Sequence, residues 1–221
     1  IVQRNSTGTI SLGGWTSISQ GNIDGGSTRA AVLYRVADGS EGANFAFSLG
    51  AGANNNTGSI VAFSGVDVAG GPFDVAPGSL SLSGSAGTTG TASAITTVSA
   101  NAAVIMLTQC DNNTTTGSWN TTVPGSLTEL YENQYNPSGS GDLTTSAAWA
   151  TKSATGSTGS GTVTFGSSVR WGAILLALKP ITVNAGPDQL VNGTSVSLVG
   201  STNAGSPTYA WTRTSGPNTP T

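Results

Sequence analysis

The stretch Val169-Arg-Trp-Gly-Ala-Ile-Leu-Leu-Ala-Leu-Lys179 contains the longest apolar segment of the chain, and Pro180 follows it directly. Its apolar part, Trp171–Leu178, is much shorter than the roughly 18 residues that a membrane-spanning helix needs. Short apolar runs bounded by turn residues are typical of buried strands. We therefore expect a strand over Val169–Lys179 and no membrane insertion.

Similar runs recur along the chain between clusters of Gly, Asn and Ser, and no stretch has a convincing helical pattern over three turns. With the last run included, the predicted strands are Thr9–Ser19, Arg29–Val36, Asn44–Leu49, Ser59–Ser64, Ala92–Ser99, Ala102–Gln109, Ser126–Glu132, Leu143–Lys152, Gly161–Phe165 and Val169–Lys179. Strands at this spacing without helices indicate an antiparallel sandwich or barrel. So many strands before Pro180 favour an all-β, antiparallel jelly-roll β-sandwich over one small immunoglobulin-like domain.

The composition is unusually poor in charge. Charged residues make up 8% of the chain, against roughly 25% in ordinary globular proteins. The 7 basic residues are scattered singly, so no basic patch exists and we expect no nucleic-acid partner. Sheets with few charged residues have little protection against edge-to-edge pairing. Contacts between subunits in a fibre would bury such edges.

Two further observations concern the cellular context. The only cysteine, Cys110, excludes an internal disulfide, and it follows the run A-V-I-M-L-T-Q, so we interpret it as a thiol at the end of a strand. An intermolecular disulfide is the alternative. The opening Ile1–Arg4 lacks the charged region and apolar core of a signal peptide. For a secreted protein, we expect that Ile1 is not the original first residue.

A domain boundary is predicted at Lys179-Pro180-Ile181, where the apolar strand ends and the phrase V-N-A-G-P-D begins at Val183. The linker is very short, so two sandwiches joined there would form a semi-rigid rod. We assign 1–180 to the first domain and 181–221 to the second.

The second segment contains V-N-A-G-P-D-Q-L-V-N-G-T-S-V-S-L-V-G-S from Val183 and Y-A-W-T-R-T-S-G-P from Tyr209. It resembles the N-terminal part of a PKD-type module, an immunoglobulin-like β-sandwich found in tandem on bacterial secreted and surface proteins. The resemblance implies that Trp211 packs on a sandwich core. Because such a sandwich has roughly 100 residues, we expect the chain to be a piece of a longer polypeptide.

The first domain has its own resemblance. The phrases G-G-W-T-S-I from Gly13, A-A-V-L-Y-R-V-A-D-G from Ala30, I-V-A-F-S-G-V-D from Ile60, P-F-D-V from Pro72 and W-G-A-I-L-L-A-L-K-P from Trp171 occur in this order. Together they resemble a jelly-roll module of bacterial surface proteins, including adhesins of the Bacteroidota, and of phage structural proteins. The resemblance implies that a first strand normally precedes G-W-T, and only Ile1-Val2 would remain of it here.

Catalytic chemistry has few candidates in this chain. There is no His, so the commonest general base and metal ligand is missing, together with every Ser-His-Asp or Cys-His arrangement. Two close pairs of acids occur, Asp67 with Asp74 and Glu129 with Glu132. Paired acids can hydrolyse glycosides, but Asp67-Val-Ala-Gly-Gly-Pro-Phe-Asp74 is more typical of a turn. We therefore predict that the chain is not an enzyme.

Two kinds of ligand remain open, and we expect no other cofactor. Loop carboxylates bind calcium, and the candidates are Asp38, Glu41, Asp67 and Asp74; solvated loop acids are the alternative. Sugars stack on exposed aromatic rings, and the candidates are Trp119, Tyr131 and Tyr135, which lie in polar phrases and are predicted to be exposed. Loop packing or a subunit contact is their alternative role, whereas Trp15, Trp149, Trp171 and Trp211 have strand-like surroundings typical of core residues.

These observations favour a non-enzymatic structural or adhesive module of a long bacterial cell-surface or secreted protein, such as a fibre, filament or adhesin. Its partners would be neighbouring copies or domains of the same polypeptide, and its location extracellular. The alternative is a carbohydrate-binding module with a PKD-like spacer from a secreted polysaccharide-degrading enzyme, which would bind surface polysaccharide. A virion or tail-fibre component is a third hypothesis.

Overall fold

The computed structural model describes residues 1–137, 141–187, 197–205, 207, 208 and 210. Every ladder between its strands is antiparallel, and no helix occurs in this described part of the chain. The predicted all-β, antiparallel sandwich architecture is thus confirmed. The chain divides into two compact units, Ile1–Pro180 and Ile181–Thr221. Nothing among the described residues forms a helix that could span a membrane.

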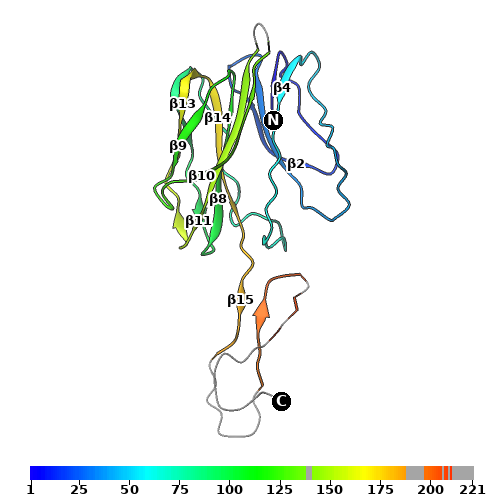
Figure 1. Ribbon diagram of the computed structural model, residues 1–221, viewed down its shortest axis with the longest axis vertical. Coiled ribbons are helices and arrows are strands. Elements are labelled where there is room, and N and C mark those ends of the chain that lie inside the picture. Colours follow the sequence, from blue (N-terminus) through cyan, green and yellow to red (C-terminus); the bar gives the residue numbers. More distant parts are fainter. Residues whose placement is uncertain (138–140, 188–196, 206, 209, 211–221) are drawn as a thin grey trace. The chain divides into compact units, whose positions relative to one another are not determined.

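The central sheet of the first unit contains the longest ladders. Its order is β10 (Thr128–Tyr135), β11 (Leu143–Lys152), β8 (Ala102–Cys110), β14 (Trp171–Leu178) and β5 (Ser81–Leu82). β8 pairs with β14 from Ala103↔Leu178 to Cys110↔Trp171. On its other edge, β8 pairs with the whole of β11 except Leu143. The two most apolar strands therefore lie side by side in the middle of the unit (Figure 1).

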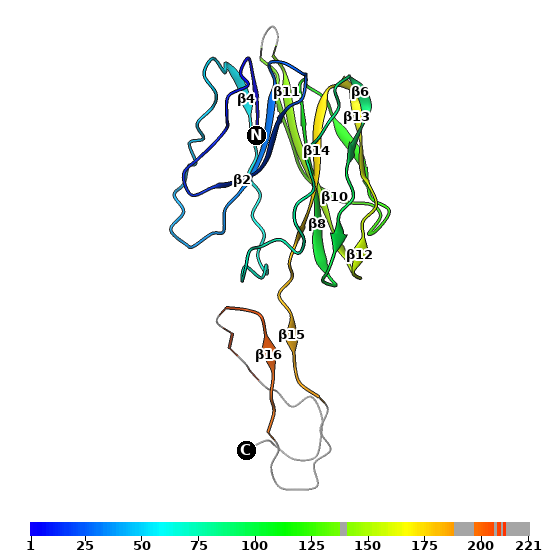
Figure 2. The same cartoon turned by 180° about the vertical axis from the view of Figure 1, so that it is seen from behind.

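Both faces of this sheet are covered, as the two opposite views show (Figures 1 and 2). On one face, Val104, Met106 and Leu175 belong to the largest core cluster. On the other, Ile105, Ile174 and Leu176 belong to a second cluster. Alternate residues of a strand point to opposite faces, so a strand buried on both sides has to be apolar at nearly every position. This explains the uninterrupted run in β14.

The sheet that covers the first face consists of β6 (Gly87–Ala92), β13 (Gly161–Val169) and β9 (Thr116–Asn120). A small ladder of β7 (Thr96–Thr97) and β12 (Gly156–Ser157) accompanies it. Its large contributions to the core are Trp119, Val163 and Phe165. The approach is close at β6, because a Cβ added to Gly90 would lie 2.8 Å from the ring of Phe165.

The sheet that covers the second face is the N-terminal one, in the order β2 (Thr16–Asn22), β3 (Arg29–Tyr34), β1 (Val2–Arg4) and β4 (Asn55–Thr57). Val2, Ile23 and Ala30 form a small core cluster with Leu143 of the central sheet. Most of residues 35–80 in this layer run as irregular chain, with isolated bridges such as Ser11↔Ser48 and Phe73↔Leu178.

Several predicted strands differ from the structure, and the N-terminal layer holds most of the differences. Asn44–Leu49 and Ser59–Ser64 form no strand. The prediction over Thr9–Ser19 fails in its first half, because Trp15 N–H donates to Leu12 O (3.0 Å) in a turn where Gly14 has a φ of +78°. The prediction over Ala92–Ser99 is interrupted between β6 and β7. Elsewhere β8, β10, β11, β13 and β14 lie at or near their predicted positions.

The second unit contains one described ladder, between β15 (Val183–Asn184) and β16 (Ser201–Thr202). The G-P turn after β15 is closed by Asn184 Oδ1, which accepts a bond from Gly186 N–H (2.8 Å), and Gly186 has a φ of +82°. Trp211, predicted to pack on a sandwich core, lies outside the described residues.

Candidate functional site: an apolar slot beside the central sheet

The three rings predicted to bind sugar are not brought together. Trp119, predicted to be exposed, is only 5% exposed and packs in the largest core cluster, so this prediction is wrong. Its Nε1–H donates to Glu129 Oε2 (3.3 Å). The physical reason is that Thr116–Asn120 forms strand β9 against β13 instead of a polar loop. Tyr131 and Tyr135, also predicted to be exposed, are half-buried on β10.

A β-bulge in β10 directs the two tyrosines to the face of the central sheet opposite to the one that Trp119 of β9 contacts. In β10 the register shifts between Glu129, which pairs with Ala148, and Tyr131, which pairs with Ala147. The extra residue reverses the alternation, so Glu129 faces the β9 layer while Tyr131 faces the N-terminal layer. Glu132 again faces β9, where its Oε2 accepts a 2.8 Å bond from the Thr116 hydroxyl. Each of the two carboxylates thus has a side-chain partner on β9.

The first pair of calcium candidates, Asp38 and Glu41, is arranged around a cation already present. Arg35 Nη2 lies 3.4 Å from Asp38 Oδ2 and 3.2 Å from Glu41 Oε1. Hydrogen bonds from Ser40, with a smaller contribution from Arg35, lower the pKa of Asp38. Backbone hydrogen bonds, first that from Asp38, lower the pKa of Glu41. Both carboxylates therefore hold the turn at 38–41 closed.

The second pair, Asp67 and Asp74, secures two points of chain beside β14. Asp67 Oδ2 lies 3.2 Å from Lys179 Nζ, and its Oδ1 accepts a 2.9 Å bond from Ala69 N–H. Asp74 Oδ2 accepts bonds from the N–H groups of Val98 (2.7 Å) and Ser99 (3.2 Å). Within the described part of the chain, no three Cys, Asp or Glu residues come close enough to hold a metal ion together.

Cys110 is buried and unbonded at the end of β8, as its interpretation as a strand-end thiol predicts. Burial, followed by the negative charges of Asp111 and Glu132, raises the pKa of its thiol. A thiol with a raised pKa is a poor nucleophile, because the thiolate is the reactive form.

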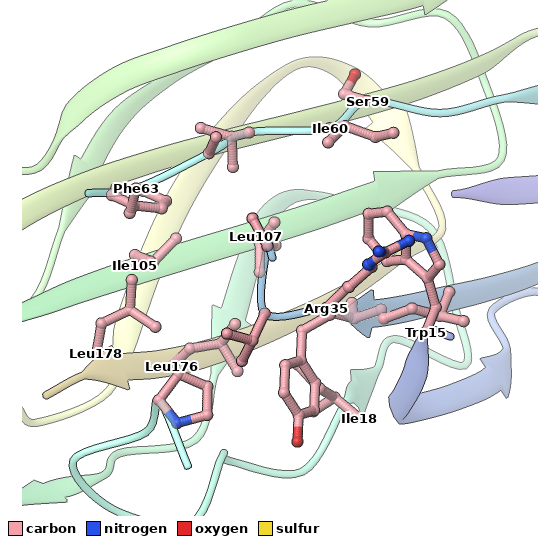
Figure 3. Close-up of a pocket in the computed structure, with 18 of the residues that line it drawn as sticks. Trp15, Ile18, Arg35, Ser59, Ile60, Phe63, Ile105, Leu107, Leu176 and Leu178 are labelled. Carbon is pink, nitrogen blue, oxygen red and sulfur yellow. The ribbon is translucent and has the colours of Figure 1, made fainter. Parts of the chain in front are cut away.

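An apolar slot of about 570 Å³ lies between the central sheet and the N-terminal layer of the first unit. Figure 3 shows Ser59, Ile60 and Phe63 along one side of it and Trp15, Ile18 and Arg35 along the other. Between them lie four aliphatic side chains of the central sheet, namely Ile105, Leu107, Leu176 and Leu178. This volume is in the range of ordinary ligand-binding cavities.

Few polar groups line the slot, and some lack partners. Trp15 Nε1–H and Gln109 Oε1 are buried without a hydrogen-bond partner. Burial raises the pKa of Tyr131 to about 12, although a hydrogen bond with Ser59 opposes the shift. The charge of Arg35 is balanced by Asp38 and Glu41. Such a lining suits an apolar occupant that brings a few hydrogen-bonding groups of its own.

Sequence reasoning missed this slot, because its walls come from segments far apart in the sequence. The signal that was present is the short apolar run Ile60-Val-Ala-Phe63, which was interpreted as part of one more strand. Comparison with known proteins adds no assignment, since no family model, no curated protein and no solved structure matches the chain.

Proposed function

We propose that this chain is a non-enzymatic structural or adhesive module of a long bacterial cell-surface or secreted protein. The first unit would be a jelly-roll sandwich and the second a PKD-like sandwich, with neighbouring domains or copies as partners. The observation that carries the proposal is the use that the first unit makes of its acidic side chains.

Residues 1–180 contain nine acidic residues. Eight of them accept hydrogen bonds or ion pairs that join separate pieces of chain or close turns, namely Asp24, Asp38, Glu41, Asp67, Asp74, Asp111, Glu129 and Glu132. Asp111, for example, accepts a 2.9 Å bond from Arg170 N–H across 59 residues of sequence. Most of the acidic side chains of the first unit therefore stabilise its fold.

Catalysis by carboxylates requires a different arrangement. A general acid must keep its proton near neutral pH, so its pKa is raised by burial or by a second carboxylate. Here the pKa of Asp24 is lowered: burial acts to raise it, but hydrogen bonds from Thr28, Gly26 and Ser27 outweigh that effect. The pKa values of Asp38 and Glu41 are lowered as well. These three acids are therefore suited to permanent ionisation in turns.

The alternative, a carbohydrate-binding module, depended on a surface formed jointly by Trp119, Tyr131 and Tyr135. Trp119 is buried on the opposite side of β10 from Tyr131 and Tyr135. A sugar platform in this chain would have to use other residues.

The structural role of the carboxylates can be tested at Asp74. We expect Asp74→Ala to lower the free energy of unfolding by about 1–3 kcal/mol, because the amides of Val98 and Ser99 lose a buried acceptor. Asp38→Ala is the control, since this carboxylate is 63% exposed and its removal should lower the stability much less. Urea unfolding measures both. Removal of a carboxylate kept for catalysis often stabilises a protein, so a more stable Asp74→Ala variant would contradict the proposal.

Location is tested separately by immunogold electron microscopy on the cells that produce the protein, with an antibody against residues 1–180. Gold along filaments or an envelope layer is the expected result. Gold absent from the cells but present on a soluble, polysaccharide-bound enzyme would favour the carbohydrate-binding alternative.

A further inference from the structure

Strand β1 covers only the first half of its neighbour β3. The ladder runs through Gln3↔Arg29 and Val2↔Ala30. It ends at a two-way bond, in which Ala31 N–H donates to Ile1 O (2.9 Å) and the nitrogen of Ile1 donates to Ala31 O (3.0 Å). β3 itself continues to Tyr34. Among the described residues, none pairs with β3 beyond Ala31 on the β1 side.

The backbone of β3 is arranged to continue this ladder. In an antiparallel pair, every second residue directs both its N–H and its C=O to the same neighbour. Since Ala31 directs both groups to Ile1, the next residues that face this side are Leu33 and Arg35. Both contribute to the lining of the slot.

The opposite wall continues the line of β4. β4 pairs with β1 through Val2↔Thr57, and a Cβ added to Gly58 would lie 3.1 Å from Cγ1 of Ile1. Residues 59–64 then alternate like a strand, because Ser59, Val61 and Phe63 are half-buried while Ile60, Ala62 and Ser64 are exposed. The structure gives residues 60–65 no backbone hydrogen bond to any other described residue.

The side chains of the two walls alternate in the register that one strand between them would require. Residues directly opposite each other in a sheet point to the same face. Counting back from Val2, the position before Ile1 would lie between Val32 and Ser59. Val32 packs with Ile105 of the central sheet, and Ser59 Oγ lies 3.1 Å from Thr145 Oγ1 of β11. Both side chains therefore face the central sheet, as two strands flanking a third would require.

We propose that the apolar slot is the seat of an additional β-strand, joined to the nitrogen of Ile1, which continues β1 between β3 and residues 59–65. The strand would span about six residues, the number from Val32 to Ala37. Its first, third and fifth residues before Ile1 would be apolar and would pack on Ile105, Leu107, Leu176 and Leu178. The intervening residues would face away from the central sheet. This inference does not depend on the proposed function.

A peptide strand fits the slot better than a lipid or another small apolar molecule. Either would fill the volume, but only a strand supplies N–H and C=O groups to pair with Leu33 and Arg35 on one side and with Val61 and Phe63 on the other. Buried backbone groups are nearly always paired. The nitrogen of Ile1 supports the same occupant. Burial lowers the pKa of this amine to about 5, whereas an amide nitrogen in the same place would carry no charge to desolvate.

The test compares two extended chains of equal composition. One carries Thr-Val-Thr-Val-Thr-Val before Ile1, which places Val at the inward positions. The other carries Val-Thr-Val-Thr-Val-Thr, which places Thr there, since a shift by one residue exchanges the two faces of a strand. Hydrogen exchange is measured at the amides of Leu33, Arg35, Val61 and Phe63, which face the added strand. We expect at least tenfold slower exchange in the first chain than in the second.

Three results would overturn the proposal. Equal exchange in the two extended chains would show that the slot does not select a strand in this register. The same protection from a long-chain fatty acid added to the 221-residue chain would identify a lipid pocket. Equal protection from the free hexapeptide would identify a strand supplied by another molecule. None of these outcomes bears on whether the acidic residues are structural, so the test of the proposed function stays independent.

Discussion

The central sheet and the N-terminal layer are both made from short alternating or apolar runs, but only the central sheet forms continuous ladders. β8 has β11 on one edge and β14 on the other over nearly its whole length. Asn44–Leu49 has one isolated bridge, at Ser48, and Ser59–Ser64 has none. An apolar alternation thus indicates an extended segment with one face to the core. Whether that segment becomes a strand depends on a partner at its side.

The sharpest test of this comparison uses two neighbouring leucines of β14 that point to opposite layers. Leu175 packs between the central sheet and β13, whereas Leu176 lines the slot. We expect Leu175→Ala to cost about 2–5 kcal/mol of unfolding free energy. Leu176→Ala should cost less, because a side chain beside a void has already lost contacts on that side. Urea unfolding of both variants gives the difference.

Equal losses at the two leucines would contradict the comparison, since they would mean that both faces of β14 are packed equally well. A larger loss at Leu176 would reverse it. The slope of the unfolding curve has to be the same in the two variants, because a changed slope signals a changed unfolded or native state.

The parts of the fold that the sequence could predict are those in which each strand carries its own signal. Leu143–Lys152 is predicted with its correct ends, and Ala102–Gln109 is one residue short of β8. Both are long apolar or Thr-rich runs between clear turn residues. β9 was missed because Thr116–Asn120 is polar except for Trp119, and its strand conformation depends on pairing with β13.

The candidate site depended on pairwise information that a single sequence lacks. The bulge between Glu129 and Tyr131 reverses which side chains of β10 share a face. No residue type in that segment predicts a bulge. The slot depends on the register of β1 with β3 and β4, which comes from hydrogen bonds between segments more than 25 residues apart in the sequence. The stretch from Asp67 to Asp74 was interpreted as a turn, but the distant partners of these two residues, Lys179 for Asp67 and the amides of Val98 and Ser99 for Asp74, were not predictable.

The covered face opposite the slot can be probed by adding a methyl group. A Cβ at Gly90 would lie 2.8 Å from Phe165 Cζ and 2.9 Å from Val163 Cγ1. We expect Gly90→Ala to cost about 1–3 kcal/mol, because a well-packed core resists an added methyl group. Gly87→Ala on the same strand is the control, since nothing lies within 4 Å of its Cβ. Thermal unfolding should show a lower midpoint for Gly90→Ala alone; an unchanged midpoint would mean that this layer is as loosely packed as the N-terminal one.

The smallest effect is expected at Ile1, where the N-terminal layer meets the slot. In the 221-residue chain, without the added strand, the amine of Ile1 has a pKa of about 5 in the folded state, lowered from 8.0 by burial. Between these values the unfolded chain binds a proton that the folded chain does not, so stability rises as the pH increases from about 5 to 8. The chain has no His, and the lowered pKa values of Asp24, Asp38 and Glu41 place their titration below this window. The effect is limited because the first residue of a strand can open locally and regain water.

Acetylation of Ile1 removes the titrating amine and should make the unfolding midpoint independent of pH over the same range. A midpoint that is already independent of pH in the unmodified chain would show that the nitrogen of Ile1 reaches water, and that β1 ends at Val2 instead of at the bond to Ala31.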